Sequence, residues 1–257
     1  MDMKKLLQSI NPIALVAEML GAFGWTFAAL AATKMAAGGL SLAQQSTKAG
    51  EVQMSFPALT MVSVPIVVAF TLAVLVAIFG KFSGGHFNPA TTIGMWVTRK
   101  IRTLPAALYI GVQFLGAFAA FGAMQAFLPS AKGILFSNPE PWKMFFAELI
   151  GAFIFAVGFS AAVRQERTTL EASFMIGGSL LLGSIFASFV LGAGVLNPAV
   201  FMATVRESIS DLSLGPVFGP IAGAVLGSLV YAVMEEPKMP KKLSDLKLKK
   251  PTVKLKK

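Results

Sequence analysis

The 257-residue sequence contains no cysteine and only one histidine, His86. Without cysteine the chain has no disulfides, no thiolate nucleophile and no thiolate-ligated metal. One histidine leaves too few imidazole ligands for most protein metal sites, and no P-loop of the Walker A type is present to hold a nucleotide phosphate. We therefore expect no enzyme activity, no metal and no cofactor.

Charged residues are also scarce. They make up 13% of the chain, about half of their usual share in a soluble domain. Hydrophobic residues make up 55%, and the mean hydropathy is +0.72. Apolar runs of about 20 residues recur, and each is long enough to cross the hydrocarbon core of a bilayer. The composition predicts an all-α, multi-pass membrane protein surrounded by lipid.

Hydropathy predicts six membrane-spanning helices, at about 11–33, 58–80, 104–127, 142–163, 170–191 and 214–234. Segments 34–53, 128–143 and 164–169 are interpreted as linkers. The first apolar run is too long for a signal-peptide core, so we interpret it as a retained span. The predicted organisation is an N-terminus at 1–10, one membrane domain at 11–234 and a basic tail at 235–257.

Lysine and arginine placement predicts the orientation. If both termini are inside, the inner side of the membrane carries eight basic residues without the tail and the outer side carries five. We therefore expect cytoplasmic termini in a plasma or inner membrane. Nine lysines lie between Lys238 and Lys257. They are interpreted as a solvated segment that fixes topology, and attraction to anionic lipid is the alternative. No aromatic residues are interleaved with the lysines, so nucleic-acid binding is not expected.

An internal repeat divides the membrane domain. The segment 17–23 (AEMLGAF) recurs at 147–153 (AELIGAF) with five of seven residues identical. Each copy lies in the first span of a three-span half, at about 11–127 and 142–234. Because three is an odd number, the second half must be inverted in the membrane relative to the first.

Each copy of the repeat contains one glutamate, Glu18 or Glu148, deep inside a predicted span. A carboxylate in this environment is costly and faces the interior of the bundle. We interpret the two glutamates as acceptors that brace the backbone of nearby loops, since they occupy matched positions. A role in proton relay or substrate binding is the alternative.

Each half also contains a short apolar helix that begins at an Asn-Pro-Ala tripeptide, Asn88-Pro89-Ala90 or Asn197-Pro198-Ala199. Proline suits the first helical turn, and asparagine caps it. About ten residues cannot span a bilayer, so each helix must begin where its free N–H groups are buried in protein or line a watery cavity. Two such helices in matched positions predict a pore or carrier site near the bilayer midplane.

These segments resemble the aquaporin family, also called major intrinsic proteins. The resemblance is carried by AEMLGAF, SGGHFNPATTIG, GVQFLGAF, FFAELIGAF, LGAGVLNPA and FGPIAGAVLGSLVY, and spans about residues 12–234. It implies six transmembrane helices and two re-entrant half-helices in an inverted 3+3 repeat. It also implies a homotetramer with a passive channel in each protomer for water, small uncharged solutes such as glycerol, or both.

The resemblance also implies roles for individual residues. Asn88 and Asn197 would donate hydrogen bonds to the permeating molecule, and Glu18 and Glu148 would brace the loops. The lumen would be lined, partly through backbone carbonyls, by the residues that precede the two asparagines: Gly85, His86, Gly194 and Val195.

The sequence departs from the family after the second Asn-Pro-Ala. The family usually has arginine there, at the outer constriction, and this chain has Val200. Arg206 lies six residues later, about 9 Å along a helix, which is too far to substitute. Valine removes a fixed charge and several donors from the constriction, and with them one barrier to cations.

The other constriction positions depend on the alignment. Counting back from Asn88 by the family's usual interval gives Val68, whereas local similarity favours Phe70. In the fifth span the count gives Ile185, or Ser184 if the loop holds an extra residue, and Gly194 or Ala193 follows on the loop. None of these choices supplies histidine or arginine, so we expect a wider or more apolar filter. It is closer in character to the solute-permeable branch of the family, but it lacks the arginine of that branch as well.

Two basic residues near the first half-helix allow two interpretations each. His86 is either a neutral residue that lines the lumen or a pH sensor. Lys81 either fixes topology or repels cations at the inner vestibule. For the whole chain, an ion channel of the same fold and a secondary transporter stay open as alternative functions. The residues do not rank water, glycerol, urea, ammonia and hydrogen peroxide as permeants.

Overall fold

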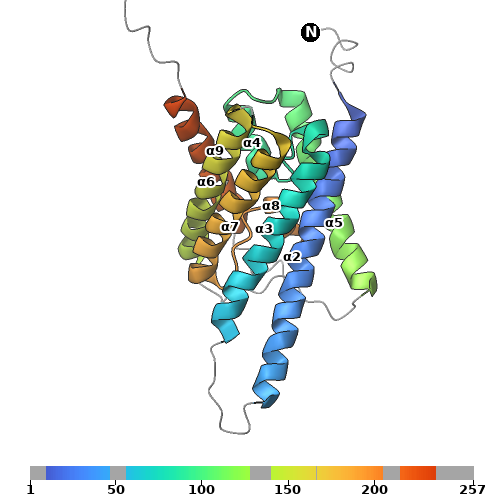
Figure 1. The fold of residues 1–257 in the computed structure, drawn as a ribbon, viewed down its shortest axis with the longest axis vertical. Helices are drawn as coiled ribbons and strands as arrows, with labels where there is room; N and C mark the ends of the chain where they lie inside the picture. The colour runs from blue at the N-terminus through green and yellow to red at the C-terminus, as the bar shows by residue number, and fades with distance from the viewer. Residues whose placement is uncertain (1–9, 47–55, 128–139, 166, 205–214, 236–257) are drawn as a thin grey trace, which may run out of the picture.

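The structure is a computed structural model that describes residues 10–46, 56–127, 140–165, 167–204 and 215–235. These residues form eight helices: α2 Pro12–Ser46, α3 Phe56–Ser83, α4 Pro89–Val97, α5 Thr103–Phe127, α6 Pro141–Arg164, α7 Thr169–Leu191, α8 Pro198–Thr204 and α9 Gly215–Met234 (Figure 1). Six are long and apolar enough to span a membrane, and α4 and α8 are the two short ones. The predicted fold of six spans and two half-helices is thus confirmed.

The bounds of the helices agree with the predicted spans to within a few residues, except around the first linker. Part of the expected linker 34–53 is helical, because α2 continues to Ser46. The added residues include alanine, leucine and glutamine, which favour helix, and no proline. The helix therefore continues through Gly38 and Gly39 in spite of their lower helix propensity.

The helices form two halves that pack side by side. In the first half α2 packs against α3 and α5, and in the second half α6 packs against α7 and α9. Helices α3 and α7 pair across the two halves. The beginning of α2 and the end of α9 lie at the same end of the bundle (Figure 1), which we call the terminal face.

Glycine allows the first helix of each half to approach the last one closely. A Cβ added to Gly116 of α5 would lie 2.2 Å from the carbonyl oxygen of Met19, and one added to Gly223 of α9 would lie 2.1 Å from that of Leu149. Met19 and Leu149 occupy the same position of the repeated segment. The two helix crossings are therefore equivalent, and small residues at such crossings are typical of membrane bundles.

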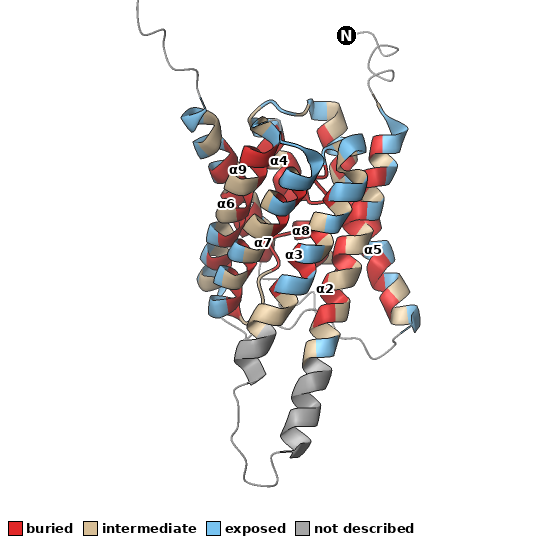
Figure 2. Ribbon diagram, viewed as in Figure 1, coloured by how far each residue is buried: buried red, intermediate tan, exposed pale blue. Residues whose placement is uncertain are grey.

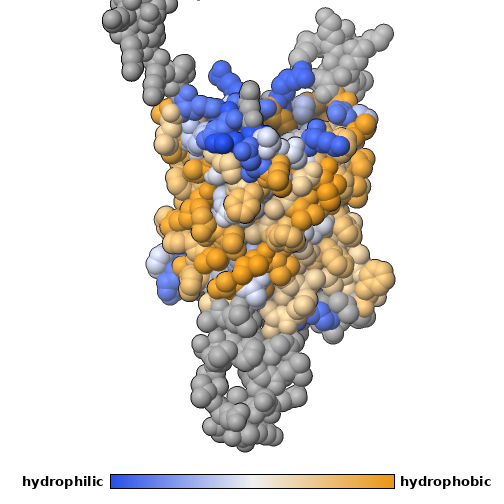
Figure 3. All heavy atoms as spheres, in the orientation of Figure 1, coloured by the Kyte–Doolittle hydropathy of each residue, from blue (hydrophilic) through white to orange (hydrophobic). Residues whose placement is uncertain are grey.

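The outer surface carries an apolar belt between two more polar ends (Figure 3). Large apolar side chains such as Phe70, Phe174 and Leu182 are exposed on the outside of the helices, whereas the buried residues line the interior of the bundle (Figure 2). A soluble monomer rarely exposes so large a continuous apolar surface. The belt is the surface expected for contact with lipid or with further copies of the chain.

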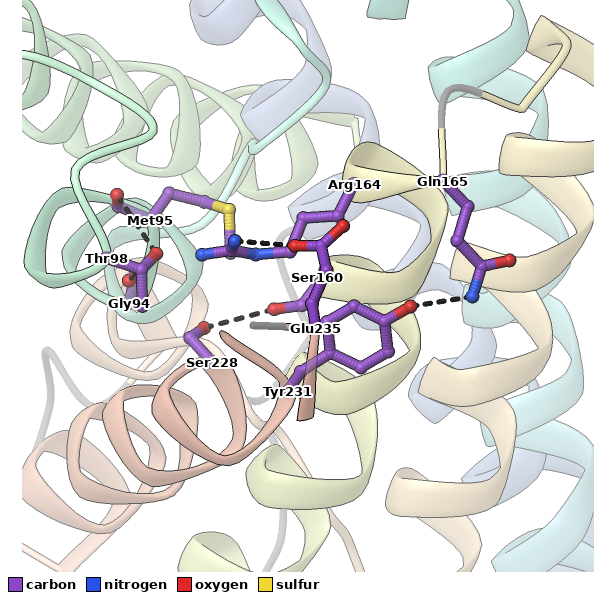
Figure 4. A network of polar contacts seen from close by, with 9 residues as sticks. All are labelled: Gly94, Met95, Thr98, Ser160, Arg164, Gln165, Ser228, Tyr231 and Glu235. Carbon is purple, nitrogen blue, oxygen red and sulfur yellow. Dashed lines mark hydrogen bonds and ion pairs between the residues drawn. The ribbon is translucent and has the colours of Figure 1, made fainter. Parts of the chain in front are cut away.

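At the terminal face, side-chain contacts attach the end of α9 to the end of α6 (Figure 4). Arg164 forms an ion pair of 2.7 Å with Glu235, and its side chain is only 9% exposed. The next residue, Gln165, donates a hydrogen bond of 2.6 Å to the hydroxyl of Tyr231, which lies one helical turn before Glu235. Deeper in the bundle the hydroxyls of Ser160 and Ser228 lie 3.4 Å apart.

Candidate functional site

The two half-helices begin in the same way. Asn88 has extended backbone, and its Oδ1 accepts a hydrogen bond of 2.8 Å from the N–H of Ala90. Asn197 likewise accepts from the N–H of Ala199 at 3.0 Å. Proline occupies the first helical position in both cases, where its missing N–H costs nothing. Each asparagine caps its own helix through the side-chain oxygen, which leaves the amide nitrogen free to donate elsewhere.

The amide nitrogen of each asparagine donates to the opposite half. Nδ2 of Asn88 donates to the carbonyl oxygen of Leu196 at 2.8 Å, and Nδ2 of Asn197 donates to the carbonyl oxygen of Phe87 at 3.2 Å. We call this reciprocal pair of bonds the asparagine clasp. It holds the amino ends of α4 and α8 together inside the bundle, where both asparagines are fully buried.

Phe87 and Leu196, which accept the clasp bonds, share an uncommon backbone conformation. Their φ angles are +50° and +53°, in the left-handed region, which costs a residue with a side chain roughly 1–2 kcal/mol. Each residue is held on both sides, because its N–H donates to a glutamate at 2.7 Å and its carbonyl accepts from the opposite asparagine. These bonds offset the cost and fix the direction of the two carbonyls.

Those glutamates are Glu18 and Glu148, and both side chains are fully buried. Glu18 also accepts from the N–H of His86 at 3.0 Å, and Glu148 accepts from the N–H of Val195 at 2.9 Å. Each carboxylate therefore binds two successive backbone N–H groups of its loop. These are the contacts that the bracing interpretation requires, and they occupy both oxygens of each carboxylate.

The first half has an additional donor that sequence reasoning missed. Nε2 of Gln113 donates to Glu18 at 2.7 Å and to the hydroxyl of Thr92 at 3.0 Å. Superposing the equivalent glycines Gly116 and Gly223 places Pro220 at the position of Gln113, so the second half has no matching amide. The available signal was an amide side chain near the middle of a predominantly apolar span.

The loop side chains rest against glycines of the repeat. A Cβ added to Gly21 would lie 2.1 Å from the ring of Phe87, and one added to Gly151 would lie 2.7 Å from the side chain of Leu196. Any larger residue would push the loop away from its glutamate. Gly84 and Gly85 have φ angles of +91° and +68°, which glycine adopts without steric cost.

His86 is buried beside the first loop. Its Nδ1 lies 3.1 Å from the hydroxyl of Thr92, and its ring contacts the rings of Tyr109 and Phe159 edge to face. The imidazole is therefore packed among neighbours on several sides.

The candidate constriction residues differ in where their side chains lie. Val68 is buried and Phe70 is 72% exposed, so the side chain of Phe70 points away from the interior. Val200 is buried in an apolar cluster that also contains Val68 and residues of α3, α6 and α7.

On the side of α7, Ser184 is buried and Ile185 is partly exposed. A Cβ added to Gly194 would lie 2.8 Å from the carbonyl oxygen of Ser184, so the loop passes directly against the helix. Ala193 and Gly194 are partly exposed, and Val195 is buried. Among the residues that the structure describes, no three His, Cys, Asp or Glu side chains lie close enough to hold a metal ion.

The model of the major intrinsic protein family matches residues 6–231. Over 190 residues the chain is 32% identical to aquaporin-5 of Mus musculus, which covers 69% of this chain and 71% of that protein. It is 34% identical over 182 residues to nodulin-26 of Glycine max, covering 67% and 66% of the two proteins.

Among solved structures, the chain is similar to an aquaglyceroporin from Plasmodium falciparum. The TM-score is 0.58, with 17% sequence identity, and the match covers 86% of this chain and 94% of that one. At this identity the likeness concerns the fold, and it agrees with six spans and two half-helices arranged as described above.

Proposed function

The chain belongs to the major intrinsic protein family of passive water and small-solute channels, and we propose that its pore conducts small uncharged polyols such as glycerol as well as water. Channels of this family are not enzymes. The relatives include aquaporins, and the similar solved structure is named an aquaglyceroporin, so the names alone leave the permeant open. The choice rests on the constriction.

The observation that carries the proposal is Val200. It is 1% exposed, lies three residues after Asn197 and belongs to an apolar cluster. An arginine at this position would add five N–H donors and a fixed charge. Valine leaves space for the carbon backbone of a polyol and favours contact with it, because its surface is apolar.

The route past the clasp explains how polar permeants cross an apolar interior. Each asparagine amide has a second N–H besides the one in the clasp, and we assign these two N–H groups to the permeant. The amino ends of α4 and α8 add partial positive charge at the same point, which disfavours cations and orients water molecules in opposite directions on the two sides. Backbone carbonyls of the two loops provide acceptors along the rest of the path.

We assign the constriction to Val68, Gly194 and Val200, with Ile185 or Ser184 from α7. The burial of Val68 supports its choice over Phe70, whose side chain lies on the outside. The close contact between Gly194 and Ser184 supports the α7 pair, since it places this part of the helix against the loop. The lumen-lining loop residues are Gly85, His86 and Val195.

The test is stopped-flow light scattering on proteoliposomes that contain the purified protein, with an osmotic gradient for water and an inward gradient for glycerol. We expect the parent to pass both. Val200→Arg should reduce glycerol flux more than water flux, and Val200→Leu is the control for size without charge. Equal glycerol flux in the parent and Val200→Arg would exclude position 200 from the constriction.

Two other functions make different predictions in the same vesicles. An ion channel would collapse a potassium gradient at a rate comparable to that of water flow. A secondary transporter would show saturable uptake driven by a second gradient. Both oxygens of Glu18 and Glu148 already bind loop N–H groups, which leaves no buried carboxylate among the described residues of the site to couple an ion.

We also propose that the terminal face is cytoplasmic and that the channel is a homotetramer. The first proposal is supported by the excess of lysine and arginine on that side of the predicted topology, with the N-terminal segment counted together with the loops. The second is supported by family membership and by the apolar belt. Accessibility of a single introduced cysteine to membrane-impermeant reagents tests the orientation, and light scattering of the detergent complex tests the subunit number.

A further inference from the structure

A cavity of about 200 Å³ lies between α3, α6 and α7. Its walls include Val76 and Gly80 of α3, Ala162 of α6 and Ile176 of α7. These residues lie toward the end of α3, the end of α6 and the beginning of α7, which all meet at the terminal face. The cavity is therefore a depression on the side of the molecule where α2 begins and α9 ends.

The inner end of this cavity reaches the first loop. Gly84, which begins the loop that leads to Asn88, is part of the wall. Val76, another wall residue, lies 3.2 Å from the point that a Cβ of Gly85 would occupy. The cavity thus ends at the loop whose carbonyls were assigned to the permeant path, and we interpret it as the entrance to that path from the terminal face.

Two charged residues line the cavity, Lys81 and Arg167, and no acidic side chain lies among its described wall residues. Nζ of Lys81 lies 4.8 Å from the centre of the Phe82 ring. Arg167 donates from Nε to Oε1 of Gln165 at 2.9 Å. Both of these partners are uncharged. Arg167 also interacts electrostatically with Glu171 in the first turn of α7, so its charge is partly balanced, whereas that of Lys81 is not balanced by its contact with Phe82.

Other basic residues of the terminal face differ from this pair. Arg164 is paired with Glu235, and its charge is therefore compensated. Arg99, Lys100 and Arg102 are exposed but are not part of the cavity wall. Lys81 and Arg167 thus differ from the other basic residues of this face because they lie in the wall of the cavity.

We propose that Lys81 and Arg167 are specificity-determining residues that exclude cations at the terminal-face entrance, in place of the fixed charge that Val200 lacks at the opposite constriction. This inference rests on the proposed channel function. Two like charges at the opening raise the free energy of a cation there, and because both side chains are exposed, this barrier is highest at low ionic strength. The half-helix dipoles act at the clasp, and the entrance charges add a second barrier in series.

The experiment compares the parent, the double variant Lys81→Gln/Arg167→Gln and the control Lys100→Gln/Arg102→Gln in proteoliposomes. Sodium efflux and osmotic water flux are measured on the same preparations at low ionic strength. We expect the cavity variant to leak sodium roughly five- to tenfold faster than the parent, with unchanged water flux. The control, which removes the same charge from the same face, should match the parent.

Salt gives a test that requires no folded variant. The Debye length is about 30 Å at 0.01 M salt and about 3 Å at 1 M, so high salt should raise the sodium permeability of the parent above its value at low salt. Adding Val200→Arg to the cavity variant should restore a low leak. If the double variant does not fold, the single variants Lys81→Gln and Arg167→Gln are used in its place.

The outcomes distinguish failure of the inference about Lys81 and Arg167 from failure of the proposed channel function. The inference is overturned if water flux is normal, the sodium leak is equal in the cavity variant, the control and the parent, and salt has no effect on the parent. This result would leave the proposed channel function intact. Absence of osmotic water flux in the parent overturns the proposed function itself.

Discussion

The side-chain amide of Asn88 donates a hydrogen bond of 2.8 Å to the carbonyl oxygen of Leu196, a residue 108 positions later in the chain. The reciprocal bond from Asn197 to Phe87 is 3.2 Å long. The two bonds join residues that are far apart in sequence and near the centre of the bundle. The position of each half-helix amino end therefore depends on contacts with the other half of the chain.

The clasp predicts that Asn88 cannot be replaced by aspartate. An aspartate side chain would keep the capping oxygen but would place a carboxylate oxygen against the carbonyl of Leu196, where a donor is required. We expect Asn88→Asp to destabilise the fold by at least about 2 kcal/mol and to abolish water flux. Thermal unfolding in detergent and stopped-flow measurements check this.

Asn11→Asp is the matched control. Asn11 caps α2 with its Oδ1, which accepts from the N–H of Ile13 at 3.0 Å, and aspartate caps a helix equally well. Unfolding temperatures that are the same for Asn11→Asp and Asn88→Asp would contradict the role given to the clasp.

Each bracing glutamate predicts a graded series. Glu148→Gln keeps one acceptor oxygen for the N–H groups of Val195 and Leu196, whereas Glu148→Ala leaves both without a partner. An unsatisfied buried N–H costs about 1–3 kcal/mol, so the unfolding temperature should fall from parent to glutamine to alanine. Alanine and glutamine variants as stable as the parent would show that the loop does not depend on this carboxylate.

The contact between Gly21 and the ring of Phe87 predicts that Gly21→Ala displaces the first loop, because the new Cβ would lie 2.1 Å from the ring. We expect lower stability, by about 1–3 kcal/mol, and lower water flux. A Cβ at Gly111 of α5 has no neighbour within 4 Å, so Gly111→Ala should be neutral. The comparison fails if both variants behave alike in flux and unfolding.

The assignment of the constriction to Val68 predicts opposite results at two nearby positions of α3. Val68 is buried and Phe70 is 72% exposed. Val68→Trp should block glycerol strongly and water less, whereas Phe70→Trp should leave both fluxes unchanged. Stopped-flow measurement on the two variants decides the register, and a selective loss of glycerol flux in Phe70→Trp would reverse it.

The ion pair between Arg164 and Glu235 predicts a measurable loss on Glu235→Gln. The side chain of Arg164 is 9% exposed, so its charge is largely removed from water and the pair should stabilise the end of α9 by about 1–2 kcal/mol. Glu140→Gln removes the ion pair with Lys143. The side chain of Lys143 is 42% exposed and that of Glu140 is 58% exposed, so this substitution should have little effect on stability. Equal unfolding temperatures for both variants would contradict this difference.

Much of the fold was predictable because its signals are local or repeated. The lengths of apolar runs predict the spans, and the matched segments around Glu18 and Glu148 predict two inverted halves. The position of each Asn-Pro-Ala after the second span of its half predicts where the half-helices begin. These inferences need only composition, spacing and the physical requirement that buried backbone groups be satisfied.

The details of the site depended on tertiary contacts that spacing does not specify. Val68 and Phe70 are two residues apart on a helix and therefore point to nearly opposite sides, so an uncertainty of two residues in the alignment exchanges interior and exterior. The left-handed backbone of Phe87 and Leu196 carries no composition signal, since neither residue is glycine. The role of Gln113 follows only once α5 is placed against α2.

Since the clasp joins Asn88 to a residue 108 positions later, a ribosome that adds about 5–20 residues per second needs roughly 5–20 s to supply the missing partner. During that interval the nascent first half already holds a polar amide and a turned carbonyl within the depth of the bilayer. Insertion of this protein must therefore shelter an incomplete polar centre, with water or with the insertion machinery, until the second half arrives.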